Sequence, residues 1–178
     1  GIQMRMQFYT CDELALILHR QAIKLNLDLA ADGASEIAGR ARGTPRVAGR
    51  LLRRVRDIAA VAGYDRVTAE VADAALHRLE VDAAGLDSMD RRYLSCLAES
   101  YSGGPVGVET LAAVLSEQRD VLEEVIEPYL MQTGLLMRTP RGRCLSSGGW
   151  AYLGITPPAS ATHQLDLLQA DDSSFDDD

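Results

Sequence analysis

One stretch of the sequence constrains the fold more than any other, because its apolar residues follow a strict helical period. Between residues 45 and 62 they recur every three or four positions: Ala48, Leu51, Leu52, Val55, Ile58, Ala59 and Ala62. Four arginines occupy the opposite face: Arg46, Arg50, Arg53 and Arg54. This pattern predicts an amphipathic helix that packs one side against a core and exposes a basic side.

Capping signals indicate further short helices in residues 1–82. Thr10-Cys11-Asp12-Glu13 has the pattern of a capping box, and Thr44 precedes Pro45 as an N-cap precedes a first helical residue. Thr68 caps another helix. We expect helices over residues 11–25, 34–41, 45–62 and 69–79. Four short helices with brief links predict a small helical bundle.

The pattern changes over residues 83–158. Helical periods at 88–101, 109–115 and 117–132 are followed by two short extended segments, 135–138 and 143–146. They flank Thr139-Pro140-Arg141-Gly142, which has Pro and Gly where a type I turn prefers them. Three helices and a β-hairpin predict a winged-helix domain. A last segment with Trp150, Tyr152, Leu153 and Ile155 is expected to pack onto it. The fold class is therefore mainly α.

The net charge of −8 comes mostly from the C-terminal segment, residues 159–178. That segment holds six of the 26 acidic residues and no Lys or Arg, which leaves 20 acidic residues against 18 basic ones in the rest. We expect this Ser- and Asp-rich tail to be disordered. Since the rest is nearly neutral and its arginines cluster, the acidic total does not exclude a nucleic-acid partner.

Several other classes of protein are disfavoured. The apolar runs are too short to span a membrane. The three cysteines are far apart and form no CxxC, so a disulfide framework or a cysteine-based zinc site is not expected, and a reducing cytoplasm fits. The three histidines are equally scattered, and we expect no metal site. The chain starts at Gly1 without a signal segment, so we expect it to be part of a longer protein.

Two groups of motifs resemble the RuvB family of AAA+ proteins. FY at residues 8–9, RARGTPR at 40–46 and RLLRRVRD at 50–57 are similar to its lid domain. GGPVG at 103–107, EPYL at 127–130, RTPRGR at 138–143 and GITPP at 154–158 are similar to its winged-helix domain. The resemblance covers residues 1–158 and implies an AAA+ lid over 1–82 and a DNA-binding winged helix over 83–158.

The resemblance further implies part of an ATP-driven motor that moves Holliday junctions in bacterial recombination and repair. It implies ATP or ADP as ligand, double-stranded DNA and RuvA and RuvC as partners, a homohexamer, and a cytoplasmic location. No GxxxxGK[ST] loop occurs in the chain. Magnesium binding, ATP hydrolysis and the RuvA surface would then belong to a separate large domain, and this chain alone should hold no catalytic residue.

The resemblance assigns nucleotide contacts to Tyr9, Pro45 and Arg46. Arg46 lies two residues after the N-cap, where helix amides and a guanidinium could both meet a phosphate. From the pattern alone, Arg46 would more simply be one member of a solvated basic face. Tyr9 could equally be a packing residue before the capping box, and the two roles are compatible.

Three arginines lie within six residues of the predicted hairpin. The turn makes Arg138 and Arg143 cross-strand neighbours and places Arg141 at the tip. Like charges that face each other across a ladder are unfavourable, so an anion between them is expected, and phosphate is the natural candidate. The sequence therefore predicts DNA contacts by Arg138, Arg141 and Arg143.

The third helix of this domain shows the opposite charge. Its exposed face is expected to carry five acids: Glu117, Asp120, Glu123, Glu124 and Glu127. Phosphates would repel such a face, so we expect the domain to bind the DNA backbone by its wing, without sequence specificity. A transcription regulator and a replication-initiator AAA+ fragment are the alternatives. The acidic helix disfavours the first, and the RGTPR and RTPRGR motifs separate the chain from the second.

Overall fold

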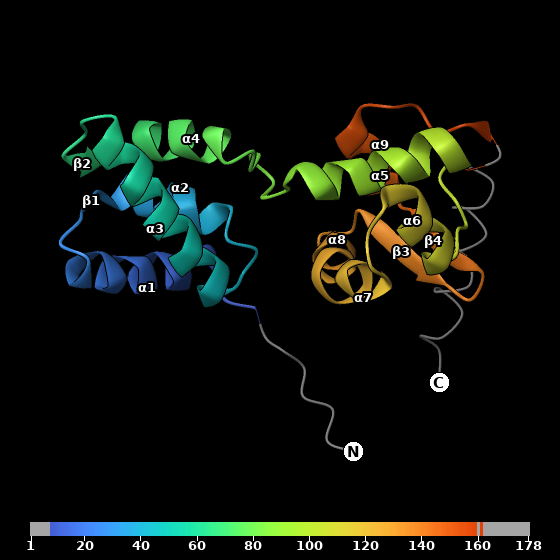
Figure 1. Cartoon of the computed structure of the whole chain (residues 1–178), viewed down its shortest axis with the longest axis horizontal. Helices are drawn as coiled ribbons and strands as arrows, with labels where there is room; N and C mark the ends of the chain where they lie inside the picture. Colours follow the sequence, from blue (N-terminus) through green and yellow to red (C-terminus); the bar gives the residue numbers. More distant parts are fainter. Residues whose placement is uncertain (1–7, 160, 162–178) are drawn as a thin grey trace, which may run out of the picture. The chain divides into compact units, whose positions relative to one another are not determined.

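The computed structural model describes residues 8–159 and 161, which are drawn in colour in Figure 1. The chain forms two compact units, one ending at Ser88 and the next beginning at Met89. The sequence placed the boundary after residue 82, six residues earlier. The intervening residues contact the first unit, because Arg42 Nε donates a hydrogen bond to the Gly85 carbonyl at 3.0 Å and its guanidinium lies 3.7 Å from Asp87.

The first unit consists of the four predicted helices. They are α1 (Cys11–Lys24), α2 (Ala31–Gly39), α3 (Pro45–Val61) and α4 (Ala69–Arg78). The capping box at Thr10 is confirmed, and the hydroxyls of Thr44 and Thr68 accept hydrogen bonds from the third amide of their helices. Only α2 starts clearly earlier than expected. Side-chain caps therefore define three of the four helix starts.

The helices enclose one apolar core. Its wholly buried side chains include Leu14, Leu18, Ile37, Leu52 and Leu76, and the apolar face of α3 lies against it as predicted up to Ala59. Ala62, expected on that face, follows the helix end and is exposed. The sequence did not predict β1 (Asp28–Leu29) and β2 (Arg66–Val67), which pair in parallel. Two-residue strands are too short to show an alternating pattern.

A buried arginine joins α2 to α4. Arg40 is 5% exposed; its guanidinium bonds to Glu36 at 2.6 Å, to Asp73, and to the Val81 carbonyl at 3.1 Å. The hydrogen bond from Arg40 lowers the pKa of the Asp73 carboxyl below its ordinary value. Arg40 thus fixes the start of the RARGTPR motif to the bundle, and the arginines of that motif do not all face solvent.

The second unit has the predicted winged-helix order. It contains α5 (Ser88–Tyr101), α6 (Val108–Leu115), a third helical segment, the strands β3 (Leu136–Thr139) and β4 (Gly142–Leu145), and α9 (Ser147–Leu153). The third segment consists of α7 (Arg119–Val121), the π-helical η1 (Leu122–Ile126) and α8 (Glu127–Gln132). Pro128 accounts for the π turn, since proline has no N–H and its ring crowds the carbonyl four residues earlier.

The hairpin has the expected register. β3 and β4 are antiparallel with Arg138 opposite Arg143, and Pro140 and Arg141 form the turn. In the segment expected to pack onto this unit, Trp150 is buried, Tyr152 and Leu153 are partly buried, and Ile155 is 38% exposed. The predicted disordered tail lies outside the described residues except for Ala159 and Ala161. Among the residues that the structure describes, no helix is both long and apolar enough to cross a membrane.

Two glycines of α2 provide a matched test of the packing between α2 and β2. A Cβ at Gly33 would collide with the backbone carbonyl of Val67, whereas a Cβ at Gly39 would meet nothing within 4 Å. We expect Gly33→Ala to destabilise the first unit by about 1–3 kcal/mol through overpacking. Gly39→Ala should leave stability unchanged or raise it by up to about 1 kcal/mol. Thermal unfolding followed by circular dichroism measures both; equal shifts would contradict the packing.

Candidate functional site

The predicted nucleotide-contacting residues lie around the start of α3. The Tyr9 amide donates a hydrogen bond to the Gly43 carbonyl at 2.9 Å, which brings Tyr9 beside the segment that leads to Pro45 and Arg46. Gly43 has a φ of +65°, and a Cβ there would lie 2.9 Å from that of Phe8. Both its left-handed backbone and its contact with Phe8 favour glycine. The RGTPR motif and the FY pair are therefore parts of one local structure.

Arg46 is placed where an anion could bind. It is the second residue of α3 and is exposed. Pro45 has no N–H, and the Val47 amide donates to the Thr44 hydroxyl at 3.4 Å. Of the first three residues of α3, Arg46 is therefore the one whose amide has no acceptor within the described part of the chain. Its guanidinium has no carboxylate partner there either. A free amide, a guanidinium and the positive end of a helix can together bind a phosphate oxygen.

The other arginines on this face of α3 are also exposed. Arg50, Arg53 and Arg54 make no ion pair with a described residue, while Arg56 pairs with its neighbour Asp57 at 2.7 Å. Tyr9 is 46% exposed, so its ring can both pack and meet a ligand. The structure thus leaves both roles of Arg46 physically available, the solvated face and the phosphate contact, and Arg46 follows Pro45 and lies three residues after Gly43, whose carbonyl bonds to the Tyr9 amide.

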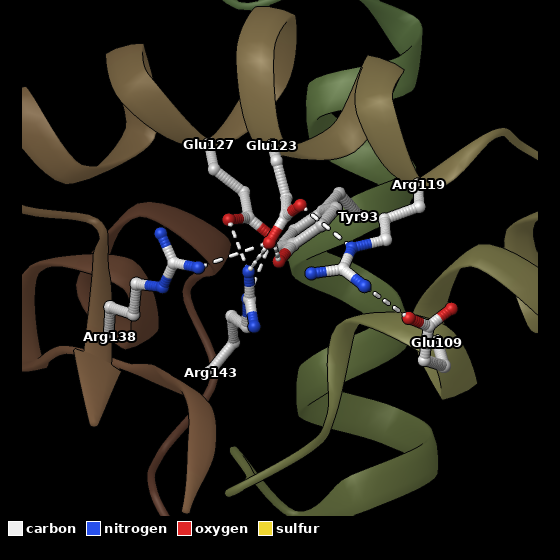
Figure 2. A network of polar contacts seen from close by, with 7 residues as sticks. All are labelled: Tyr93, Glu109, Arg119, Glu123, Glu127, Arg138 and Arg143. Atoms are coloured by element: carbon white, nitrogen blue, oxygen red, sulfur yellow. Dashed lines mark hydrogen bonds and ion pairs between the residues drawn. The ribbon is translucent and has the colours of Figure 1, made fainter. Parts of the chain in front are cut away.

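The wing arginines are in three different environments, and Figure 2 shows two of them, those of Arg138 and Arg143. Arg143 is 7% exposed and is held by Glu127 at 2.9 Å and by Glu123 at 2.8 Å. Arg138 is half exposed and bonds to the same Glu123 oxygen at 3.0 Å. Arg141, at the turn, is exposed and has no partner in the described part of the chain. The carboxylate of Glu123 therefore supplies the anion that the cross-strand pair was expected to take from DNA.

Glu127 corrects the predicted exposed face of the third helix. It is wholly buried, and the buried Tyr93 hydroxyl donates to its Oε1 at 2.9 Å. Glu123 is also largely covered, Glu117 is partly covered, and among the five acids only Asp120 and Glu124 are exposed. The π turn explains the error, because an extra residue per turn rotates every later position by about 100° from its place on a regular α-helix.

Charge and burial determine the protonation of this network. Hydrogen bonds from Arg119 and Arg143 lower the pKa of Glu123, so this carboxylate stays ionised. Burial, reinforced by the neighbouring Glu127, raises the pKa of Tyr93 far above its ordinary value, so the phenol keeps the proton that it donates. Arg119 completes the network with bonds to Glu123 at 2.8 Å and Glu109 at 2.7 Å. Of these contacts, only the i,i+4 pair of Arg119 with Glu123 follows from a helical pattern, because the others join residues 10 or more positions apart.

No group of three or more His, Cys, Asp or Glu side chains in the described ranges is arranged to hold a metal ion. The residues around Arg46 offer donors to an anion rather than ligands to a cation. They fit the phosphate of a nucleotide and do not fit its magnesium ion.

The two units match known domains in order. Residues 9–82 match the family described as the RuvB AAA lid domain, and residues 83–154 match the RuvB C-terminal winged helix domain. A AAA+ lid followed by a winged helix is thus the class that the fold defines. The chain belongs to the RuvB family and carries its lid and C-terminal winged-helix domains.

Relatives and solved structures agree with this assignment. The chain is 65% identical over 168 residues to the Holliday junction branch migration complex subunit RuvB of Rhodospirillum centenum, covering 94% of this chain and 46% of that protein. The Gluconobacter oxydans protein of the same name is 61% identical, covering 98% and 50%. The Thermotoga maritima RuvB Holliday junction branch migration motor is 42% identical with a TM-score of 0.82, covering 86% and 51%. The chain spans about half the length of these relatives.

The buried network makes Glu127 a structural residue of the wing. Glu127→Ala would leave the Arg143 guanidinium buried without its main partner, and we expect a loss of about 3–5 kcal/mol in the stability of the second unit. Glu109→Ala removes an exposed partner of Arg119 and should cost at most about 1 kcal/mol. Trp150, the single tryptophan, is buried in this unit, so its fluorescence during urea unfolding reports both variants. Similar urea midpoints for the two variants would show that the ion pair between Glu127 and Arg143 is not needed for folding.

Proposed function

We propose that this chain is the nucleotide-responsive lid and the DNA-binding domain of an ATP-driven motor that moves Holliday junctions. The observation that carries the proposal is the order of the two domains, each with its own RuvB match, in one chain. ATP hydrolysis and magnesium binding would belong to the portion of the relatives that this chain does not span. By itself the chain would bind DNA without hydrolysing ATP.

In this proposal, Arg46 contacts the nucleotide phosphates from the lid. ATP would supply the free energy through cleavage of its terminal phosphate bond. The exposed Arg46 guanidinium and its adjacent free amide would bind the phosphates, and Tyr9 and Pro45 would line the same pocket. Loss of the phosphate would remove the anion that holds the start of α3, so the lid would respond to the nucleotide state.

The winged-helix domain would bind the sugar-phosphate backbone of the DNA duplex. Arg141 at the tip and Arg138 on β3 are exposed and can reach phosphates, whereas Arg143 is internal and would act by fixing the wing. Asp120 and Glu124 face solvent on the third helical segment, and phosphates would repel them. Contacts of this kind read no base edges, which suits a motor that must move along any sequence.

The assembly would be a homohexamer around double-stranded DNA at the junction, in the bacterial cytoplasm, with RuvA and RuvC as partners. The names of the relatives, which are subunits of a branch migration complex, support the DNA and RuvA partners. Three free cysteines are compatible with a reducing compartment. The exposed acids of the third helical segment disfavour a sequence-specific regulator, which would need that surface for base contacts.

Arg46→Ala tests the lid. In a protein that joins this chain to a nucleotide-hydrolysing domain, we expect a loss of ATP turnover of at least tenfold, because a phosphate contact worth more than about 1.4 kcal/mol disappears. Duplex affinity of the chain itself should not change. Arg54→Ala, which removes an exposed arginine farther along α3, is the matched control. Normal ATP turnover in Arg46→Ala would mean that Arg46 is only a member of the solvated basic face of α3.

Arg138→Ala and Arg141→Ala test the wing. Each should weaken the binding of two unrelated duplexes to the same degree, and the slope of log affinity against log salt should shrink by about 0.9 per lost contact. Fluorescence anisotropy at several salt concentrations measures this. Arg20→Ala, an exposed arginine of the first unit, controls for net charge. A loss of affinity for only one of the two duplexes would favour a sequence-specific regulator instead.

A further inference from the structure

Three guanidinium groups converge on one carboxylate between the third helical segment and the wing. Glu123 Oε1 accepts hydrogen bonds from Arg138 and Arg143, and Oε2 accepts one from Arg119 at 2.8 Å (Figure 2). The three arginines come from α7, β3 and β4, so the fold has brought Arg119 together with two arginines that face each other across the hairpin and follow it by 19 and 24 positions. A single carboxylate is the counter-ion that all three share.

The arginines of this cluster differ in how firmly they are held. Arg143 is buried and keeps two further hydrogen bonds to the buried Glu127, at 2.9 and 3.1 Å. Arg138 and Arg119 are 53% and 52% exposed, and Arg138 has Glu123 as its one carboxylate partner among the described residues. Arg119 has one other, the exposed Glu109. Solvent therefore reaches two of the three guanidiniums beside Glu123.

An oxyanion bound by several guanidiniums is also the arrangement in which proteins bind phosphate, since planar N–H donors match its oxygens. A carboxylate and a phosphodiester each carry one negative charge. Exposed ion pairs contribute little to stability, so a DNA phosphate can replace Glu123 at the two exposed arginines at small cost. The replacement would leave Arg143 in place on Glu127.

We propose that Arg119 and Arg138 form a phosphodiester-binding site at the base of the wing, and that Glu123 occupies this site as an internal substitute until DNA displaces it. The inference rests on the proposed DNA-binding function of the wing and adds Arg119 to its contacts. Arg119 lies on the segment whose exposed acids would otherwise repel DNA, so the site gives that segment one point of attachment to the backbone. Glu123 sets how strongly the site attracts phosphate.

Arg119→Ala is the first test, with binding of this chain to a fluorescein-labelled duplex as the measurement. Loss of one phosphate contact should weaken binding about five- to tenfold in 0.1 M salt and reduce the salt slope by about 0.9. Arg20→Ala is the control for the same change of net charge. Because the Arg119 side chain is half exposed, the variant should fold, which the Trp150 fluorescence checks. Unchanged affinity and slope relative to Arg20→Ala would overturn the proposal.

Glu123→Gln tests the displacement, and Glu124→Gln is its matched control. The two carboxylates are adjacent in sequence, but Glu124 is exposed and has no arginine partner within the described ranges. We expect Glu123→Gln to tighten duplex binding about three- to fivefold beyond Glu124→Gln, because the neutral amide competes less strongly for the guanidiniums. The gain should vanish when Arg119 and Arg138 are both Ala. Equal effects of the two Gln variants would show that Glu123 does not compete with phosphate.

Arg141→Ala separates a failure of this inference from a failure of the proposed function. Arg141 lies at the wing tip, outside the cluster around Glu123. If Arg141→Ala weakens binding while Arg119→Ala does not, the wing contacts DNA and the phosphate site at its base is wrong. If Arg119→Ala, Arg138→Ala and Arg141→Ala all leave binding unchanged, the wing is not the DNA contact.

Discussion

The buried contact between Glu127 and Arg143 is the interaction on which the second unit depends. It ties β4 to the third helical segment, and the Tyr93 hydroxyl adds α5 to the same carboxylate. Burying two charges is costly unless each finds its partner with good geometry, so arrangements of the three elements that separate Glu127 from Arg143 are disfavoured. The position of the wing follows from this pair, and so does the placement of every exposed side chain on it.

The first unit is also held together by a buried arginine with carboxylate partners. Arg40 is buried against Glu36 and Asp73 and fixes the segment that leads into α3. In both units, motifs rich in arginine combine internal and external roles: Arg40 and Arg143 organise the fold, while Arg46 and Arg141 face solvent. A motif of this kind can be retained in a family for two physical reasons at once, and the burial of each side chain separates them.

Local signals made much of the fold predictable. The helices of the first unit were predicted from their apolar periods and from the caps at Thr10, Thr44 and Thr68. The pairing of Arg138 with Arg143 was predicted from the residues of the hairpin turn. The site was less predictable. Whether an arginine is free depends on partners that are distant in the chain, and a π turn changed the face on which Glu127 lies. Neither the distant ion-pair partners nor the π turn changes the periodic pattern of apolar residues in a single sequence.

The hydrogen bond from Arg42 to the Gly85 carbonyl links the RGTPR loop to the segment by which the chain leaves the first unit. Arg42 and Arg46 are separated by a single turn of backbone, so the loop has one arginine at its inner end on this exit segment and one at its outer end in solvent. A shift of this five-residue loop would therefore act on two places at once, the solvent-facing start of α3 and, through the Arg42 side chain, the exit segment at Gly85.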